Sequence, residues 1–175
     1  SSYKKKTGTL ITKRSNLINN KIVTGISFTQ NDSKVSLIGV KDKPGVAAAI
    51  FKPLSKKSIN VDMVVQNISA NGKETDLTFT IKTEDLNKTK KTIQENKDIS
   101  YRKLIFDKGV SKISIIGVGM ITTPGVTFRM FQTLANKKIN IQVISTSEIK
   151  ISVLINKKNT KKALEALHKE FKLDK

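Results

Sequence analysis

The sequence predicts an α+β chain of two βαββαβ modules, each with a four-stranded antiparallel sheet and two helices on one face. The first observation behind this prediction is an internal repeat, because residues 35–40 (VSLIGV) return as residues 113–118 (ISIIGV). The second is that both copies alternate short β-branched runs with longer segments whose apolar residues recur at helical spacing. The 175 residues suffice for one medium domain or two small ones.

The repeat continues well beyond its first strand. Residues 44–46 (PGV) return as residues 124–126 at an offset of 80, whereas the first strand has an offset of 78. The second copy therefore has two extra residues in the loop before the helix. Residues 77–81 return as residues 151–155 at an offset of 74, so the second copy has lost six residues between its middle strands. We expect a shared fold with different loops.

The first copy predicts all six elements of a module. Its strands are apolar and β-branched, and Pro44 opens its first helix, where the missing N–H of proline costs nothing. Asn71-Gly72 is a strong hairpin signal between the middle strands, and Thr83 is placed to cap the second helix. In chain order we expect a strand at 35–40, a helix opened by Pro44, strands at 59–68 and 75–82, a helix after Thr83, and a strand at 101–106.

The second copy is one strand short. Its predicted elements are a strand at 112–118, a helix at 125–138, strands at 139–146 and 149–155, and a helix at 159–171. A spare strand, residues 22–28 (IVTGISF), lies before the first copy and has no partner there. Our hypothesis is that this strand completes the second module, so that the second module is built around the first. Pairing of residues 22–28 inside the first module would contradict it.

Composition excludes several classes of chemistry. The chain has no cysteine, so disulfides, thiolate metal sites and cysteine nucleophiles are absent. The single histidine, His168, has no second histidine or cysteine nearby, and there is neither a Walker phosphate loop nor a dinucleotide-binding glycine motif. We therefore expect no catalytic residue, metal or cofactor here. No apolar run reaches the roughly 18 residues of a membrane span, so we expect a cytoplasmic protein without a membrane partner.

The formal charge of +19 raises nucleic-acid binding as an alternative. Only three of the 33 basic residues are arginine, which contacts phosphates and base edges best, and the lysines are spread through every segment. The βαββαβ order is shared with the RNA-recognition motif, but the strand at 77–82 offers one aromatic residue, Phe79, where that motif stacks bases on several. We interpret the lysines as a solvated surface, and a basic RNA-binding protein stays the less favoured alternative.

Both copies place Pro-Gly directly before a helix, which suits binding of an amino acid. The N–H groups that open a helix attract an anion, and glycine lets a carboxylate approach closely because it has no Cβ. The ligand's ammonium requires oxygen ligands, and Asp42 supplies a carboxylate beside the first helix. Gln66 offers a donor and an acceptor to a hydroxyl side chain such as that of threonine. A plain tight turn and a solvated loop carboxylate stay open as alternatives.

The element order, with a glycine-ended first strand and Pro-Gly before the helix, resembles the ACT domain, a small ferredoxin-like amino-acid-binding module. More closely, the chain resembles the regulatory region of bacterial aspartate kinases along nearly its whole length. The most specific piece is residues 144–152 (ISTSEIKIS). The other stretches that carry the likeness are 23–26 (VTGI), 42–45 (DKPG), 60–67 (NVDMVVQN), 75–80 (TDLTFT), 117–120 (GVGM), 124–126 (PGV) and 140–141 (NI).

The resemblance implies that the modules bind threonine, lysine or both and thereby inhibit phosphorylation of aspartate, with ATP and magnesium only in a separate kinase domain. It also implies a homodimer in which the first module of one chain faces the second module of the other. Residues 1–3 and 8–12 resemble the junction after the kinase domain, and the start looks like a cut or processed end. We expect a linker at 1–20, a first module at 34–107, and a second module at 21–30 plus 108–172.

Two effector sites are implied, each with residues from both modules. The loop at 120–123 (MITT) departs from the more polar or basic loop common in the family, so the ligand of the second site stays open. An amino-acid sensor for another enzyme also stays open, as does the choice between a natural small subunit and an excised piece. The first site comprises Asp42, Lys43, Pro44, Gly45, Val46, Ala47, Gln66, Asn67, Asn140, Ile141 and Ser147. The second comprises Met120, Thr122, Thr123, Pro124, Gly125, Val126, Thr127, Asn60, Val61, Asp62 and Glu148.

Overall fold

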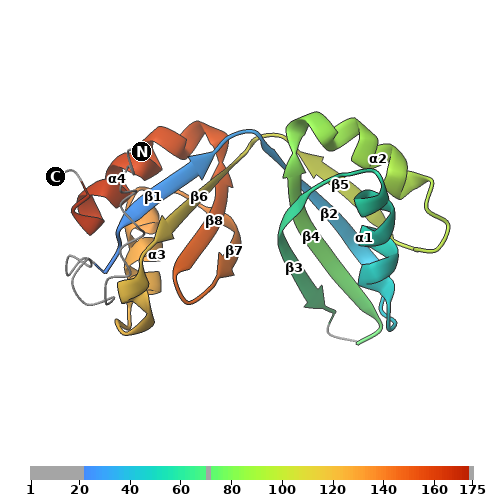
Figure 1. Ribbon diagram of the computed structural model, residues 1–175, viewed down its shortest axis with the longest axis horizontal. Helices are drawn as coiled ribbons and strands as arrows, with labels where there is room; N and C mark the ends of the chain where they lie inside the picture. Colours follow the sequence, from blue (N-terminus) through green and yellow to red (C-terminus); the bar gives the residue numbers. More distant parts are fainter. Residues whose placement is uncertain (1–21, 70–71, 174–175) are drawn as a thin grey trace, which may run out of the picture.

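The computed structural model describes residues 22–69 and 72–173 and shows two βαββαβ modules (Figure 1). Each module has one four-stranded antiparallel sheet, and its two helices cover the face turned away from the other module. The two sheets therefore face each other across the middle of the molecule. The predicted linker at 1–20 and Asn71 of the predicted hairpin lie outside the described residues.

The first module has the sheet order β3-β4-β2-β5, so its first and third strands are central. Val35 and Phe79, opposite each other on the two central strands, both point into the core. Thr83 does not cap the second helix, contrary to prediction, because its hydroxyl pairs with Ser33 Oγ at 2.9 Å and a short 3₁₀ turn precedes the helix. The elements are β2 (Asp32–Lys41), α1 (Val46–Lys56), β3 (Val61–Ile68), β4 (Glu74–Lys82), η2 (Thr83–Asp85), α2 (Leu86–Gln94) and β5 (Lys103–Asp107).

The second module has the equivalent order β1-β6-β8-β7, in which β1 comes from the N-terminal side of the first module. β1 pairs antiparallel with β6, from Gly25 opposite Ile116 to Thr29 opposite Lys112. Val23, just before β1, is 2% exposed in the core of this module. The elements are β1 (Gly25–Thr29), β6 (Val110–Ile116), η3 (Val118–Ile121), α3 (Val126–Asn136), β7 (Ile141–Thr146), β8 (Lys150–Asn156), η4 (Lys157–Asn159) and α4 (Thr160–Phe171).

The second module is thus built around the first, and the strand before the first copy takes the place that the sequence hypothesis gave it. The predicted fold class, two ferredoxin-like βαββαβ modules, is confirmed. Two short connectors, residues 30–31 and 108–109, join the modules and run together between them (Figure 1). The module boundaries drawn from the sequence stay predictions.

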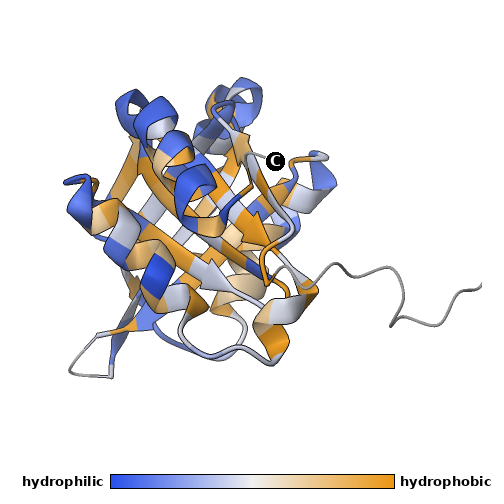
Figure 2. Ribbon diagram, turned by 90° about the vertical axis from the view of Figure 1, so that its left-hand side faces the viewer, coloured by the Kyte–Doolittle hydropathy of each residue, from blue (hydrophilic) through white to orange (hydrophobic). Residues whose placement is uncertain are grey.

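Each module has its own hydrophobic core between its sheet and its helices. In the first, the rings of Phe51 and Phe79 meet edge-on with centroids 5.2 Å apart, so Phe51 packs toward the core rather than into a ligand site. Figure 2 shows hydrophobic residues along the strands and hydrophilic residues on the outer turns of the helices. The separate cores leave the facing surfaces of the two sheets available for contacts between the modules.

Candidate functional site

The starts of helices α1 and α3 share one backbone geometry. Gly45 and Gly125 precede them with φ of 87° and 88°, in the left-handed region where a side chain would be strained. Neither helix has an acidic residue in its first turn. No carboxylate within the first turn therefore offsets the positive end of either helix dipole, and the first N–H groups favour an anion.

The start of α3 opens onto a cavity of about 550 Å³. Its walls come from η3, the first turn of α3, and the turn between β7 and β8. The sequence placed most of these residues in the second site, and Ser147 in the first. The lining residues are Met120, Ile121, Thr123, Pro124, Gly125, Val126, Thr127, Thr146, Ser147, Glu148 and Ile151.

The cavity combines complementary charges with apolar walls. The helix start offers N–H groups to a carboxylate, and the exposed Glu148 offers a carboxylate to an ammonium. The turn that carries Glu148 is held by a hydrogen bond from Ser147 N–H to Lys150 O at 2.8 Å. Ile121, 52% exposed, adds apolar surface at the same cavity. The arrangement can bind a zwitterion with an aliphatic side chain.

Two glycines of the second module fix the loop beside this cavity. A Cβ on Gly117 would lie 2.1 Å from Ile22 O, and one on Gly119 would lie 2.7 Å from Ile22 Cα. The segment that leads into β1 therefore lies directly against the η3 loop. Met120 lines the cavity and also packs against the core of the second module. Ile22 packs against the same core.

The start of α1 is built differently. The loop from Asp42 to Gly45 follows a longer strand, and Asp42 N–H donates to Lys73 O at 2.9 Å, which ties the loop to the beginning of β4. Asp42 is half-buried, Lys43 and Pro44 are exposed, and Val46 is buried under the first turn. Gln66 is exposed on β3.

Other predicted residues of the first site line a cavity of about 430 Å³ between the two sheets. Asn67 of β3 and Ile141 of β7 both belong to it, together with Asp76. Asn140, just before β7, is exposed. The lining of this cavity does not include the residues at the start of α1. Within one chain the residues predicted for the first site therefore form separate groups.

The predicted second site is also divided. Asn60, Val61 and Asp62 line a small cavity of about 80 Å³ at the junction of the modules, together with Asp32 and Lys112. Thr122 is exposed on the η3 loop and does not line the larger cavity. The residues that the sequence drew from the first module thus lie apart from the cavity at α3.

The carboxylate of Asp62 is held in its charged form. Partial burial raises the pKa of Asp62, but hydrogen bonds from Lys112 and from Met63 N–H, with the charges of Lys112 and Lys150, outweigh burial and lower the pKa below its ordinary value. Nearby, the hydrogen bond and charge of Asp32 raise the pKa of Lys82. These residues form a charged cluster at the junction.

Sequence reasoning missed three residues of the cavity at α3, namely Ile121, Thr146 and Ile151. Thr146 and Ile151 flank the turn that was identified, so their neighbours in sequence were the available signal. Within residues 22–69 and 72–173 no cluster of three histidine or acidic residues could hold a metal. No helix in that part of the chain has the length and apolarity to cross a membrane.

The sequence pattern of the ACT domain matches residues 35–96 and 113–171. The chain is 44% identical over 176 residues to an aspartokinase of Pseudomonas aeruginosa and 38% identical over 176 residues to aspartokinase 2 of Bacillus subtilis. These alignments cover 99% and 100% of this chain but only 42% and 43% of the two relatives. The chain thus spans less than half the length of these relatives.

Two solved structures resemble nearly the whole described fold. A crystal structure of aspartokinase alpha and beta subunits has a chain 42% identical, with a TM-score of 0.78, over 86% of this chain and 99% of that one. The ligand-free regulatory subunit of aspartate kinase from Thermus thermophilus is 34% identical, with a TM-score of 0.80, over the same shares of the two chains.

Proposed function

The chain belongs to the ACT-domain family as a regulatory region of an aspartate kinase, and from this premise we propose that it binds threonine, lysine or both and lowers kinase activity in response. The reaction so controlled is phosphorylation of aspartate, at the start of lysine, threonine and methionine biosynthesis. The kinase part, with its ATP and magnesium, is a separate domain or subunit. The proposed location is the cytoplasm.

The observation that carries this proposal is the cavity at the start of α3. It joins a helix start whose first turn has no acidic residue to the carboxylate of Glu148 across a volume of about 550 Å³. A free amino acid brings a carboxylate and an ammonium on one carbon, and these two partners match them. The surrounding aliphatic residues accept the methylenes of a side chain.

A homodimer would reunite the residues that one chain separates. Strands β3 and β7 are edge strands and carry the exposed side chains Val64, Ile68 and Ile144. Exposed edge strands pair readily with another chain. Placing β3 of one chain beside β7 of its partner would bring the first module of one chain against the second module of the other, as the family resemblance implies.

Calorimetric titration of the purified chain tests the proposal. Threonine and lysine are titrated first, then methionine and isoleucine, while the mass in solution is followed alongside. We expect saturable heat with threonine or lysine and stabilisation of a dimer. Absence of heat with all four amino acids would contradict the proposed ligand class.

Variants locate the binding site. Glu148→Gln removes the charge that faces the ammonium, and we expect roughly 10- to 100-fold weaker binding at the second site, since a hydrogen bond to a charged group contributes about 1.5–3 kcal/mol. Asp42→Ala and Gln66→Ala should weaken threonine binding at the first site without unfolding the chain, because Asp42 is only half-buried and Gln66 is exposed. Glu95→Gln, on the surface at the end of α2, is the matched control. Unchanged affinity in all three variants would move the sites elsewhere.

A further inference from the structure

The facing surfaces of the two sheets are related by the internal repeat. Lys34 on β2 and Lys112 on β6 occupy equivalent positions, 78 residues apart. Each crosses to the other module, where Lys34 donates to Gln142 on β7 and Lys112 donates to Asp62 on β3. Asp62 and Gln142 are themselves equivalent, 80 residues apart. The contacts between the modules therefore have approximate two-fold symmetry, although a single chain makes them.

The hydroxyl pairs on the facing surfaces follow the same symmetry. Ser36 pairs with Thr78 at 2.9 Å on the first sheet, and Ser114 pairs with Ser152 at 2.7 Å on the second. These pairs satisfy polar groups on each sheet without reaching the other module. In the described part of the chain, the crossing lysines thus supply side-chain hydrogen bonds from one sheet to the other.

The two crossing lysines have unequal surroundings. The side chain of Lys112 is 16% exposed and meets two carboxylates of the first module, Asp62 and, at 3.5 Å, Oδ2 of Asp32. The side chain of Asp32 is 5% exposed, and its Oδ2 accepts no hydrogen bond from the described residues. Lys34 meets the neutral amide of Gln142, and its carboxylate neighbour at 3.8 Å is Asp107 of its own module.

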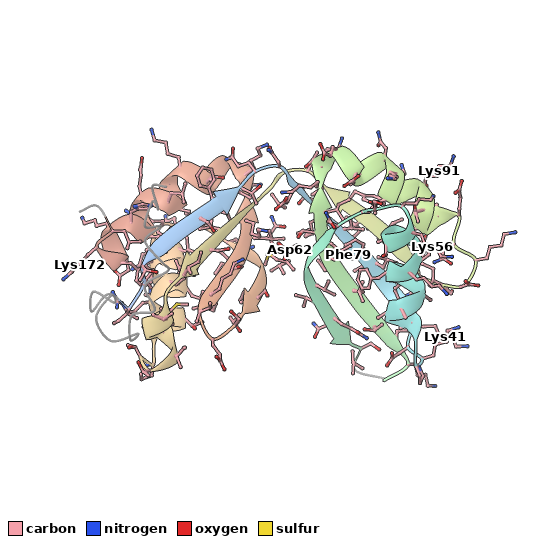
Figure 3. All side chains as sticks on the ribbon, in the orientation of Figure 1. Lys41, Lys56, Asp62, Phe79, Lys91 and Lys172 are labelled. Carbon is pink, nitrogen blue, oxygen red and sulfur yellow. The ribbon has the colours of Figure 1, made fainter. Side chains whose placement is uncertain are left out.

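Removing Lys112 would therefore leave a buried carboxylate oxygen of Asp32 without a nearby cation, whereas removing Lys34 would not. Oδ1 of Asp32 would keep Lys82 at 2.9 Å, but Oδ2 would lose its only cation in the described part of the chain. Loss of a charged partner destabilises the folded protein more when the remaining carboxylate is buried than when it is exposed. In Figure 3, Asp62 lies on the side of β3 that faces the second module, where Lys112 reaches it.

The two connectors between the modules are only two residues long each. Asn31 O accepts from Thr83 N–H at 2.8 Å in the first module, and Gly109 O accepts from Lys157 N–H at 2.7 Å in the second. Each connector is thus anchored at one of its residues, and the two run together between the modules (Figure 1). Rotation about this pair of connectors would open or close the space between the sheets, which includes the cavity of about 430 Å³.

We propose that Lys112 is a positioning residue that fixes the angle between the two sheets by linking β6 of the second module to Asp32 and Asp62 of the first. Lys34 makes the equivalent but weaker contact. Together the two lysine contacts hold the sheets at one angle, and the two connectors form the hinge about which that angle would change. The proposal concerns one chain and stands independently of which amino acid the modules bind.

The absence of cysteine makes the angle directly measurable. Lys90→Cys on α2 and Lys161→Cys on α4 place two spin labels on exposed outer helices of different modules. Electron–electron double resonance, with the labelled chain diluted in an excess of unlabelled chain so that a dimer partner carries no label, then gives the distribution of distances between the two labels of one chain. We expect one narrow distribution for the otherwise unchanged chain, and a broader distribution with a shifted mean for Lys112→Met. Lys34→Met, the matched control at the equivalent position, should broaden it less.

Melting temperature separates positioning from plain stability. A role confined to stability would lower the melting temperature of Lys112→Met and leave the distance distribution unchanged, and this result would overturn the proposal. Lys112→Arg, which keeps the charge, should restore the narrow distribution. Should Lys112→Met fail to fold, Asp62→Asn decides, because the side chain of Asp62 is 60% exposed and its loss spares the core. Asp62→Asn should broaden the distribution, and an unchanged one would also overturn the proposal.

Discussion

The glycine near the end of the first repeated strand has a different backbone conformation and a different covering group in each module. Gly39 lies at φ +64° in a bulge of β2, and the side chain of Arg102 covers it. Gly117, its repeat partner, has an extended backbone with φ 176°, and the backbone of Ile22 covers it. In each module the covering segment leads into the edge strand beside the glycine's own strand, which is β5 in the first module and β1 in the second. The same fold thus covers one position with a side chain, which is ion-paired with Glu74, in one copy and with backbone in the other.

The loops that follow diverge accordingly. β2 continues past its bulge to Lys41, which pairs with Glu74, whereas β6 ends at Ile116 and the chain turns into η3. The two extra residues of the second copy become part of a 3₁₀ turn and of one wall of the cavity at α3. The repeat preserves topology, and loop length decides where a cavity opens.

Deleting residues 1–31 should have the largest effect. The first module keeps all four of its strands, while the second loses β1 and the buried Val23. We expect the second module to lose more than about 4 kcal/mol of stability, an exceptional value that loss of a whole strand justifies. Hydrogen exchange followed by mass spectrometry should show lost protection over residues 110–171 and retained protection over residues 32–107. Equal protection in both modules would show that β1 is dispensable.

Substitution of the two glycines comes next. Gly117→Ala places a Cβ against backbone that cannot move aside, so we expect a loss of about 3 kcal/mol. Gly39→Ala places a Cβ 2.1 Å from Arg102 Nε, so this side chain must shift from its ion pair with Glu74 at 2.7 Å, and the left-handed backbone adds a cost of about 1–2 kcal/mol. Urea unfolding followed by circular dichroism compares the two variants. A larger loss for Gly39→Ala would mean that the Arg102 side chain is fixed as firmly as the Ile22 backbone.

The smallest expected effect concerns acid stability at the junction. Because the pKa of Asp62 is lowered in the folded chain, the unfolded chain takes up its proton more readily, and stability falls as the pH drops below about 3.8 toward the folded pKa. Asp62→Asn should flatten this part of the pH profile and leave the profile at neutral pH unchanged in slope. Unfolding measured between pH 2 and pH 7 checks this, with Asp98→Asn on the surface as the control. Identical slopes for Asp62→Asn and the unchanged chain would contradict the lowered pKa.

The topology was predictable because it follows from counting strands. The second copy lacked one strand and residues 22–28 had no partner, so their pairing with β6 needed no distance information. The opposite backbones of Gly39 and Gly117 were not predictable, since both stand in nearly identical strand sequences. The Thr83 cap failed because Ser33, 50 residues earlier, competes for its hydroxyl. The crossing lysines depend on how the modules face each other, which no local pattern encodes.

The candidate sites were predictable only in part. The cavity at α3 gathers residues that are near one another in sequence, on either side of the 147–150 turn and the Pro124-Gly125 step. Residues assigned from the first module, such as Asn60 and Asp62, lie at the junction instead. Their assignment depends on a second chain, and that part stays a prediction until the dimer is measured.

The placement of β1 has a consequence for synthesis on the ribosome. Thr24 donates to Ile116 O, 92 positions later in the chain. At a synthesis rate of about 5–20 residues per second, β1 therefore waits roughly 5–20 s before β6 is made. The complete first module leaves the ribosome during that interval and can fold while β1 is still unpaired. The nascent chain therefore carries an unpaired β1 beside a complete first module, and the second sheet is complete only after β6, β7 and β8 have been synthesised.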